Sequence, residues 1–156
     1  GAIGLPGLTP QVVSTGLDHL LVPLGAPEAV AGLRPDLTAV GRLTERLGVV
    51  GLYAFALAPL SAAGAASSLE ARARFFAPTH GVPEDPATGS AAGPLGAYLS
   101  SRGRLPGDRL TVRQGIEMGQ ASRLEVEVEE REAGGGAVIR VAGRVVPLIT
   151  GTLTLP

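Results

Sequence analysis

The segment that most restricts the possible folds is AAGPLGAYLSSR, residues 91–102, which is followed by Gly103. It is small and apolar nearly all round, and a helix of that kind is buried on every side rather than along one face. Pro94 is tolerated in a first turn, where its missing N–H has no intrahelical partner, so we expect the helix to begin close to Ser90. Such a helix needs a surrounding layer of structure that encloses it.

The surrounding sequence is mostly strand-like. Patterns typical of strands cover residues 11–24, 49–58, 70–77, 109–118, 121–132 and 137–155. Gly16 interrupts the first of these and predicts a bulge. The small residues of 60–68 and 133–136 predict a hairpin connection and a turn. In 70–77, arginines alternate with small or aromatic residues, which predicts a strand with one exposed face.

Two further stretches, 26–33 and 36–47, show helical patterns. The second has apolar residues along one face, a plausible N-cap at Asp36 and a plausible C-terminal glycine at Gly48. All these elements together predict an α+β fold, in which a mostly antiparallel or mixed β-sheet is wrapped around one buried central helix. The length of 156 residues suits a single domain over residues 1–156.

Composition excludes several classes of function. The 13 basic residues are all arginine and are balanced by 14 acidic ones, which argues against nucleic-acid and membrane partners. The absence of cysteine removes disulfides, thiolate nucleophiles and cysteine-ligated zinc. No apolar run has the length of a membrane span and no signal peptide opens the chain, so we expect a soluble, cytoplasmic protein.

The stretch PEDPATGSAAG, residues 83–93, carries the chemistry that the sequence suggests. It places two adjacent carboxylates before a helix N-terminus, where free N–H groups and the helix dipole favour a bound carboxylate or phosphate. We therefore expect Asp85 to be catalytic and the substrate to be bound by Thr88, Gly89, Ser90 and Ala91. The alternative is purely structural: Thr88 or Ser90 caps the helix and Asp85 is a turn residue.

EDPATGSAAG, preceded by RFFAPTHGVP, resembles the signature of the PhzF-like isomerase family. The stretches VSTGLDHLLVPL, QGIEMGQASRLEVEV and VAGRVVPLITGTLTL resemble the second domain of that family in the same order. The resemblance implies a diaminopimelate epimerase-like fold, in which two similar domains enclose the active site. Residues 1–156 then correspond to the C-terminal domain, and the N-terminal domain is absent.

For function, the resemblance implies proton-transfer isomerisation of a small carboxylated molecule, without metal or organic cofactor. The family draws a Glu and a His from its N-terminal domain, and an Asp and a Ser that match Asp85 and Ser90. Since that domain is absent, we expect the isolated chain to be inactive. The lack of cysteine separates the chain from the two-thiol epimerases of the same fold.

Three other polar residues attract attention. His19 could contact a ligand, although a hydrogen-bonded histidine at a strand end is the simpler interpretation. His80 is interpreted as a loop residue and Glu84 as a solvated neighbour of Asp85. Serine-hydrolase and nucleotide-binding patterns are not matched.

A non-enzymatic alternative remains: a truncated domain that binds a small anion or associates with itself. The expected partners are therefore a small carboxylated substrate and either the missing domain or a second copy of the chain, as a homodimer.

Overall fold

The computed structural model describes residues 4–58, 69–130 and 136–154. Its strands are β1 (Gln11–Ser14), β2 (Asp18–Pro23), β3 (Gly51–Leu57), β4 (Leu69–Ala77), β5 (Val82–Asp85), β6 (Arg109–Gln114), β7 (Ser122–Glu130) and β8 (Ala137–Gly143). Its α-helices are α1 (Pro27–Ala31), α2 (Leu37–Leu47) and α3 (Gly89–Ser100), and short 3₁₀ turns cover Pro78–His80 and Pro106–Asp108.

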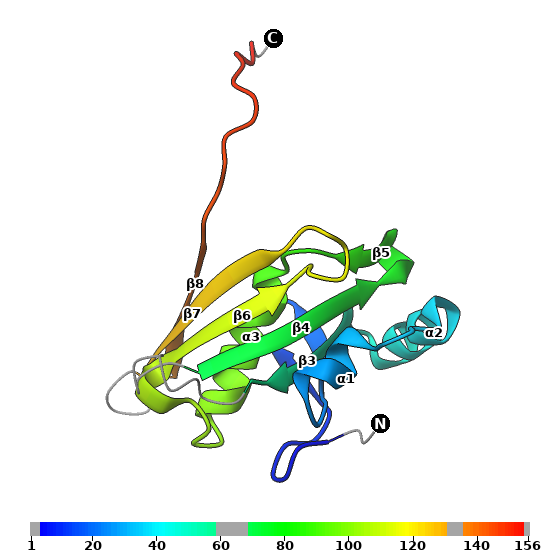
Figure 1. Ribbon diagram of the computed structural model, residues 1–156, viewed down its shortest axis with the longest axis vertical. Helices are drawn as coiled ribbons and strands as arrows, with labels where there is room; N and C mark the ends of the chain where they lie inside the picture. The colour runs from blue at the N-terminus through cyan, green and yellow to red at the C-terminus, as the bar shows by residue number, and fades with distance from the viewer. Residues whose placement is uncertain (1–3, 59–68, 131–135, 155–156) are drawn as a thin grey trace.

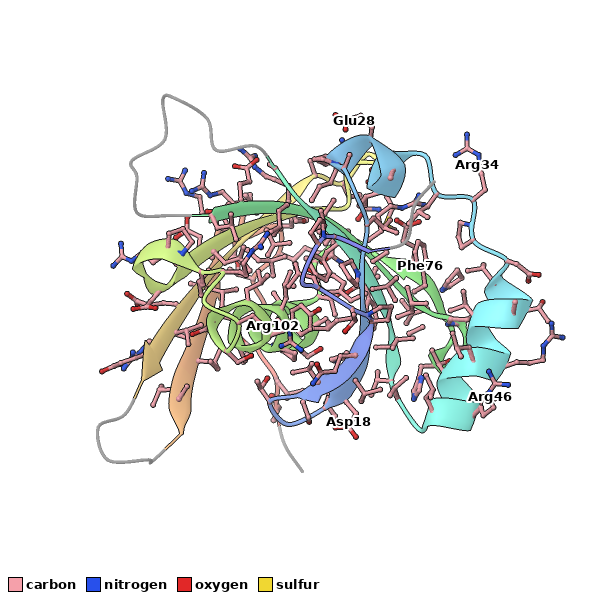
Figure 2. All side chains as sticks on the ribbon, turned by 90° about the horizontal axis from the view of Figure 1, so that it is seen from below. Asp18, Glu28, Arg34, Arg46, Phe76 and Arg102 are labelled. Atoms are coloured by element: carbon pink, nitrogen blue, oxygen red, sulfur yellow. The ribbon has the colours of Figure 1, made fainter. Side chains whose placement is uncertain are left out.

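The strands form one mixed sheet of eight strands in the order β1-β2-β3-β4-β6-β7-β8, with β5 added along β4. The β2/β3 and β4/β6 pairs are parallel, and the other pairs are antiparallel. Figure 1 shows α3 behind the sheet, with α1 on the opposite side of it. Figure 2, in which Arg102 lies just beyond the end of α3, shows the sheet curling around this helix, with α1 and α2 outside the curl. The predicted α+β fold with a wrapped central helix is confirmed.

The main core lies between α3 and the inner face of the sheet. Leu95, Tyr98 and Leu99 of α3 are buried together with inward-facing side chains of β3, β4, β6 and β7. A second, smaller cluster lies under α1, where Val30 packs against Ala54 and Ala56. Tyr53 and Phe55 of β3 both belong to the main core.

Helix α3 approaches the sheet closely because its contact face carries glycines. A Cβ placed on Gly96 would lie 2.6 Å from Val126 Cγ1, and one on Gly93 would lie 3.5 Å from Val141 Cγ2. The helix begins at Gly89, next to Ser90 as predicted, but Pro94 lies in its second turn and not in the first. Pro94 therefore removes the N–H that would have bonded to the Ser90 carbonyl.

Three strand predictions need correction. Residues 11–24 are not one bulged strand, because Gly16 at φ +138° is in the turn of the β1–β2 hairpin. The last strand stops at Gly143, and residues 144–154 continue as an exposed extension (Figure 1). The arginines of β4 do not mark an exposed face: Arg74 is buried beneath α1 and donates to the Leu33 carbonyl.

The predicted helix boundaries agree with the structure better than the predicted strand boundaries do. Asp36 accepts a bond from the Ala39 amide and Gly48 adopts a left-handed conformation, which confirms both predicted ends of α2. The first helix is shorter than predicted and ends before Gly32. The connection 60–68 and most of the turn 133–136 lie outside the described residues.

Candidate active site

The motif 83–93 joins β5 to α3 at one end of the sheet. Asp85 is the last residue of β5 and lies opposite Phe75 of β4. Its carboxylate is partly buried, and its Oδ2 accepts a hydrogen bond of 2.5 Å from the Thr88 hydroxyl. Thr88 occupies the N-cap position of α3 but makes no side-chain cap bond. The hydroxyl therefore holds Asp85 instead of capping the helix.

The buried side-chain amide of Gln114 holds Asp85 and Thr88 in this arrangement. Gln114, the last residue of β6, donates through Nε2 to the Asp85 carbonyl at 2.6 Å and to Thr88 Oγ1 at 2.8 Å. Its Oε1 accepts from the Tyr53 hydroxyl at 2.9 Å and from the Thr88 amide at 3.3 Å. Gln114 and Tyr53 have no accessible surface, so these bonds form in the protein interior.

The first turn of α3 supplies N–H groups beside the motif. The amides of Ala91 and Ala92 donate to the Thr88 carbonyl, at 3.2 and 3.0 Å. Within residues 4–58, 69–130 and 136–154, the amides of Gly89 and Ser90 have no hydrogen bond outside the helix, and Ser90 is exposed. These two N–H groups can receive an anion, whereas the N–H of Ala91 is already engaged.

An open hollow of about 670 Å³ adjoins the motif at Ala87. Its other walls are residues 121–125, where β7 begins, and residues 142–145, where β8 ends and the exposed extension begins. A larger hollow of about 1020 Å³ lies by the loop 103–109, at the opposite end of α3 from Gly89. We relate the smaller hollow to the site, since it contacts the segment that carries the carboxylate.

Glu84 differs from its predicted role as a solvated neighbour of Asp85. Its two carboxylate oxygens accept from Arg74 Nε at 2.7 Å and Nη2 at 2.8 Å, and both side chains are largely buried. The hydrogen bond and charge of Glu84 raise the pKa of Arg74 against the opposing effect of burial. This bidentate pair ties β5 to β4 immediately before Asp85.

The histidines have different surroundings. His19 in β2 is fully buried, its ring meets Phe75 edge-on at 5.3 Å, and neither ring nitrogen has a hydrogen-bond partner among the described residues. Burial lowers its pKa, while the Asp18 charge and the Ser90 backbone act in the opposite direction. His80 is exposed beside Thr79.

Sequence reasoning missed Gln114 and Tyr53 as parts of the site. Both lie within predicted strands, and Gln114 opens the stretch QGIEMGQAS, which carries only the family resemblance. In the described part of the chain, no three histidine, aspartate or glutamate side chains gather as metal ligands would. No helix there is long and apolar enough to cross a membrane.

Comparison with known proteins gives consistent matches. The family model described as "Phenazine biosynthesis-like protein" matches residues 2–151. An uncharacterized isomerase from Deinococcus radiodurans is 41% identical over 148 residues, covering 88% of this chain and 46% of that protein. The trans-2,3-dihydro-3-hydroxyanthranilate isomerase of Pseudomonas aeruginosa is 36% identical over 131 residues, covering 82% of this chain and 42% of that protein.

The chain is also similar to part of the length of solved structures. A PhzF-family phenazine biosynthesis protein from Bacillus anthracis has a TM-score of 0.68 at 24% identity, covering 83% of this chain and 43% of that one. A predicted epimerase from Pseudomonas aeruginosa has a TM-score of 0.54 at 32% identity, covering 90% and 46%. The chain thus spans about half the length of the curated relatives it matches.

Proposed function

Because the chain belongs to the phenazine biosynthesis-like protein family, we propose that it forms the C-terminal half of an isomerase that moves a proton on a small carboxylated molecule. Asp85 assists the proton transfer or holds the substrate, and no cofactor takes part. The observation that carries this proposal is the carboxylate of Asp85, fixed by Thr88 next to the amides of Gly89 and Ser90. A fixed carboxylate beside an anion site suits general acid–base chemistry on a carboxylated substrate.

In this proposal the motif residues divide into two roles. The N–H groups of Gly89 and Ser90, and the exposed Ser90 hydroxyl, contact the substrate carboxylate. Thr88 is 6% exposed and its hydroxyl is engaged with Asp85 and Gln114, so it supports Asp85 from inside. Ala91 contributes to the shape of the first turn, because its N–H is engaged with Thr88.

The proposed partner is the remaining half of the family's protein, which supplies the other catalytic groups. The exposed extension 144–154 supports a second body: Val145, Leu148 and Ile149 are 88–92% exposed, although such side chains are usually buried. Figure 1 shows this extension leaving the sheet after β8. A second copy of this chain, as a homodimer, is the competing partner.

The test uses the full-length protein with trans-2,3-dihydro-3-hydroxyanthranilate, the compound in the name of the Pseudomonas aeruginosa relative. We expect solvent deuterium to enter this compound, and Asp85→Asn to slow that exchange about 10²- to 10⁴-fold, as loss of a positioned acid–base group does. Asp36→Asn is the matched control, because asparagine caps a helix as well as aspartate does. Unchanged exchange in Asp85→Asn would remove Asp85 from the chemistry, and no exchange by the unaltered protein would overturn the isomerase proposal for this substrate.

A further inference from the structure

Gln114 is a buried polar residue that the proposed chemistry does not itself use. A glutamine amide offers two N–H donors and two acceptor lone pairs on its oxygen. In this protein all four are occupied: the oxygen accepts from Tyr53 and from the Thr88 amide, and the nitrogen donates to the Asp85 carbonyl and to the Thr88 hydroxyl. A fully buried amide with complete bonding has one defined orientation.

The orientation of this amide cannot be reversed. If the amide were turned over, its NH₂ group would face the Thr88 N–H, which can only donate. The Tyr53 hydroxyl reinforces the observed orientation, because burial and then the Asp85 charge raise the pKa of Tyr53 and keep its phenol protonated. Tyr53 therefore remains a donor to Oε1 at 2.9 Å.

The amide also determines where the Thr88 hydroxyl points its hydrogen. Because Gln114 Nε2 donates to Thr88 Oγ1 at 2.8 Å, the oxygen of that hydroxyl serves as acceptor toward Gln114. Its single hydrogen is then available for Asp85 Oδ2 at 2.5 Å. Oδ1 of the same carboxylate has no hydrogen bond within the described residues and stays available to a substrate.

The backbone next to Gln114 contacts the same motif. Gly115 has φ +74°, and a Cβ there would lie 2.8 Å from the Pro86 carbonyl oxygen and 2.4 Å from that of Gln120. The turn after β6 is thus packed directly against the residue that follows Asp85. The end of β6 and the motif are held together by side-chain bonds and by backbone contact.

We propose that Gln114 is a positioning residue: from beneath the motif, it aims the Thr88 hydroxyl at Asp85 and so fixes the carboxylate for proton transfer. The inference rests on the proposed function of Asp85. It adds a residue from a strand distant in sequence, and it assigns Tyr53 the task of fixing the amide of Gln114.

The kinetic test uses the full-length protein and the deuterium exchange described above. We expect Gln114→Met and Thr88→Val to lower kcat about 10- to 100-fold, the cost of a small misplacement of a reacting group, with KM changed less. Thr88→Ser retains the hydroxyl and should keep most of the activity. Thr44→Val is the matched control for a buried threonine, since the Thr44 hydroxyl bonds only within α2.

A double-variant cycle separates positioning from general damage. If Gln114 acts through Asp85, Gln114→Met should cause no further loss in an Asp85→Asn background. The tyrosines offer a second pair of variants: Tyr53→Phe removes the buried bond to Gln114, and Tyr98→Phe removes a partly buried bond to the Thr9 carbonyl. We expect only Tyr53→Phe to lower kcat. An equal further loss in the Asp85→Asn background, or equal losses in both tyrosine variants, would overturn the proposal.

A measurement without substrate distinguishes failure of this inference from failure of the proposed function. In NMR spectra of the unaltered protein, the Gln114 side-chain NH₂ protons should exchange slowly with solvent. Thr88→Val should shift at least one of them, and Thr44→Val neither. Fast exchange, or no shift in Thr88→Val, would refute the hydrogen-bond arrangement whatever the activity. If the arrangement holds and the unaltered protein catalyses no exchange, the isomerase proposal fails for this substrate, and the role of Gln114 in that reaction fails with it.

Discussion

Arg74 and Glu84 show how a single ion pair fixes the segment that carries Asp85. Their side chains are 8% and 18% exposed, and Arg74 also donates to the Leu33 carbonyl at 2.9 Å. A partner removed from such a pair leaves a buried charge without compensation. The pair therefore joins the region after α1, strand β4 and strand β5 into one unit.

We predict that Arg74→Met lowers the free energy of unfolding by about 3–5 kcal/mol, the usual cost of breaking a buried pair. The control is Arg109→Met, because Arg109 and its partner Glu127 are 65% and 47% exposed and an exposed pair contributes about 0–1 kcal/mol. Urea unfolding of both variants gives the comparison. Equal losses of unfolding free energy in the two variants would show that the buried pair stabilises the protein no more than the exposed pair does.

His19 predicts a pH dependence of stability. Burial lowers its pKa below the ordinary value of 6.5, so the unfolded chain takes up a proton before the folded protein does. Stability should therefore fall as the pH drops below about 6.5, and the fall should continue until the pH passes the folded pKa. In urea unfolding between pH 7 and pH 5, His19→Leu should flatten this slope and His80→Gln should not. An unchanged slope in His19→Leu would contradict the prediction.

At the scale of elements, helix α3 depends on glycines where it meets the sheet. A Cβ on Gly96 would lie 2.6 Å from Val126 Cγ1, whereas one on Gly93 would have its nearest contact at 3.3 Å, to Thr15 Oγ1. We predict that Gly96→Ala destabilises the protein by about 1–3 kcal/mol through overpacking. In Gly93→Ala, the helix propensity of alanine should offset most of the strain. The urea unfolding midpoints of the two variants give the comparison. Equal losses of stability would mean that β7 shifts easily to make room for the added Cβ.

The central helix could be predicted because its signal is local: twelve consecutive residues that are small or apolar on every side. The helix caps of α2 were equally readable. The pattern of 137–155 predicted a strand to the end of the chain, but a strand also needs a neighbour, and beyond Gly143 the described residues provide none. Alternation of side chains gives the tendency to form a strand and does not supply the partner.

The site could likewise be predicted only where its residues are close in sequence. Asp85, Gly89 and Ser90 lie within one short motif, so sequence reasoning could place them together. Gln114 is 26 residues from Thr88, and Tyr53 is 61 residues from Gln114. Their meeting depends on the pairing of β3 with β4 and of β4 with β6. Periodicity within a segment carries no information about which strands become neighbours.

At the scale of the whole molecule, the extension 144–154 is a segment that does not pack into the fold. It follows β8 directly, every residue in it is exposed, and after Arg144 it carries no charge. Val146 and Leu153 are 79% and 84% exposed. An apolar, β-branched segment of this kind gains stability by pairing with the edge of another sheet. We expect the proposed second body to provide such an edge.

We therefore predict that removing residues 144–156 leaves the core intact but abolishes association with the other half of the full-length protein. The unfolding free energy should change by less than about 0.5 kcal/mol, because residues 144–154 are all exposed. Association is measured by sedimentation of the two halves produced separately. Leu148→Ser with Ile149→Ser should weaken it, whereas Thr150→Ser, the matched control on the same extension, should not. If the truncated chain still binds the other half, the extension is not the contact. If the intact chain sediments as a dimer of itself and ignores the other half, the partner is a second copy.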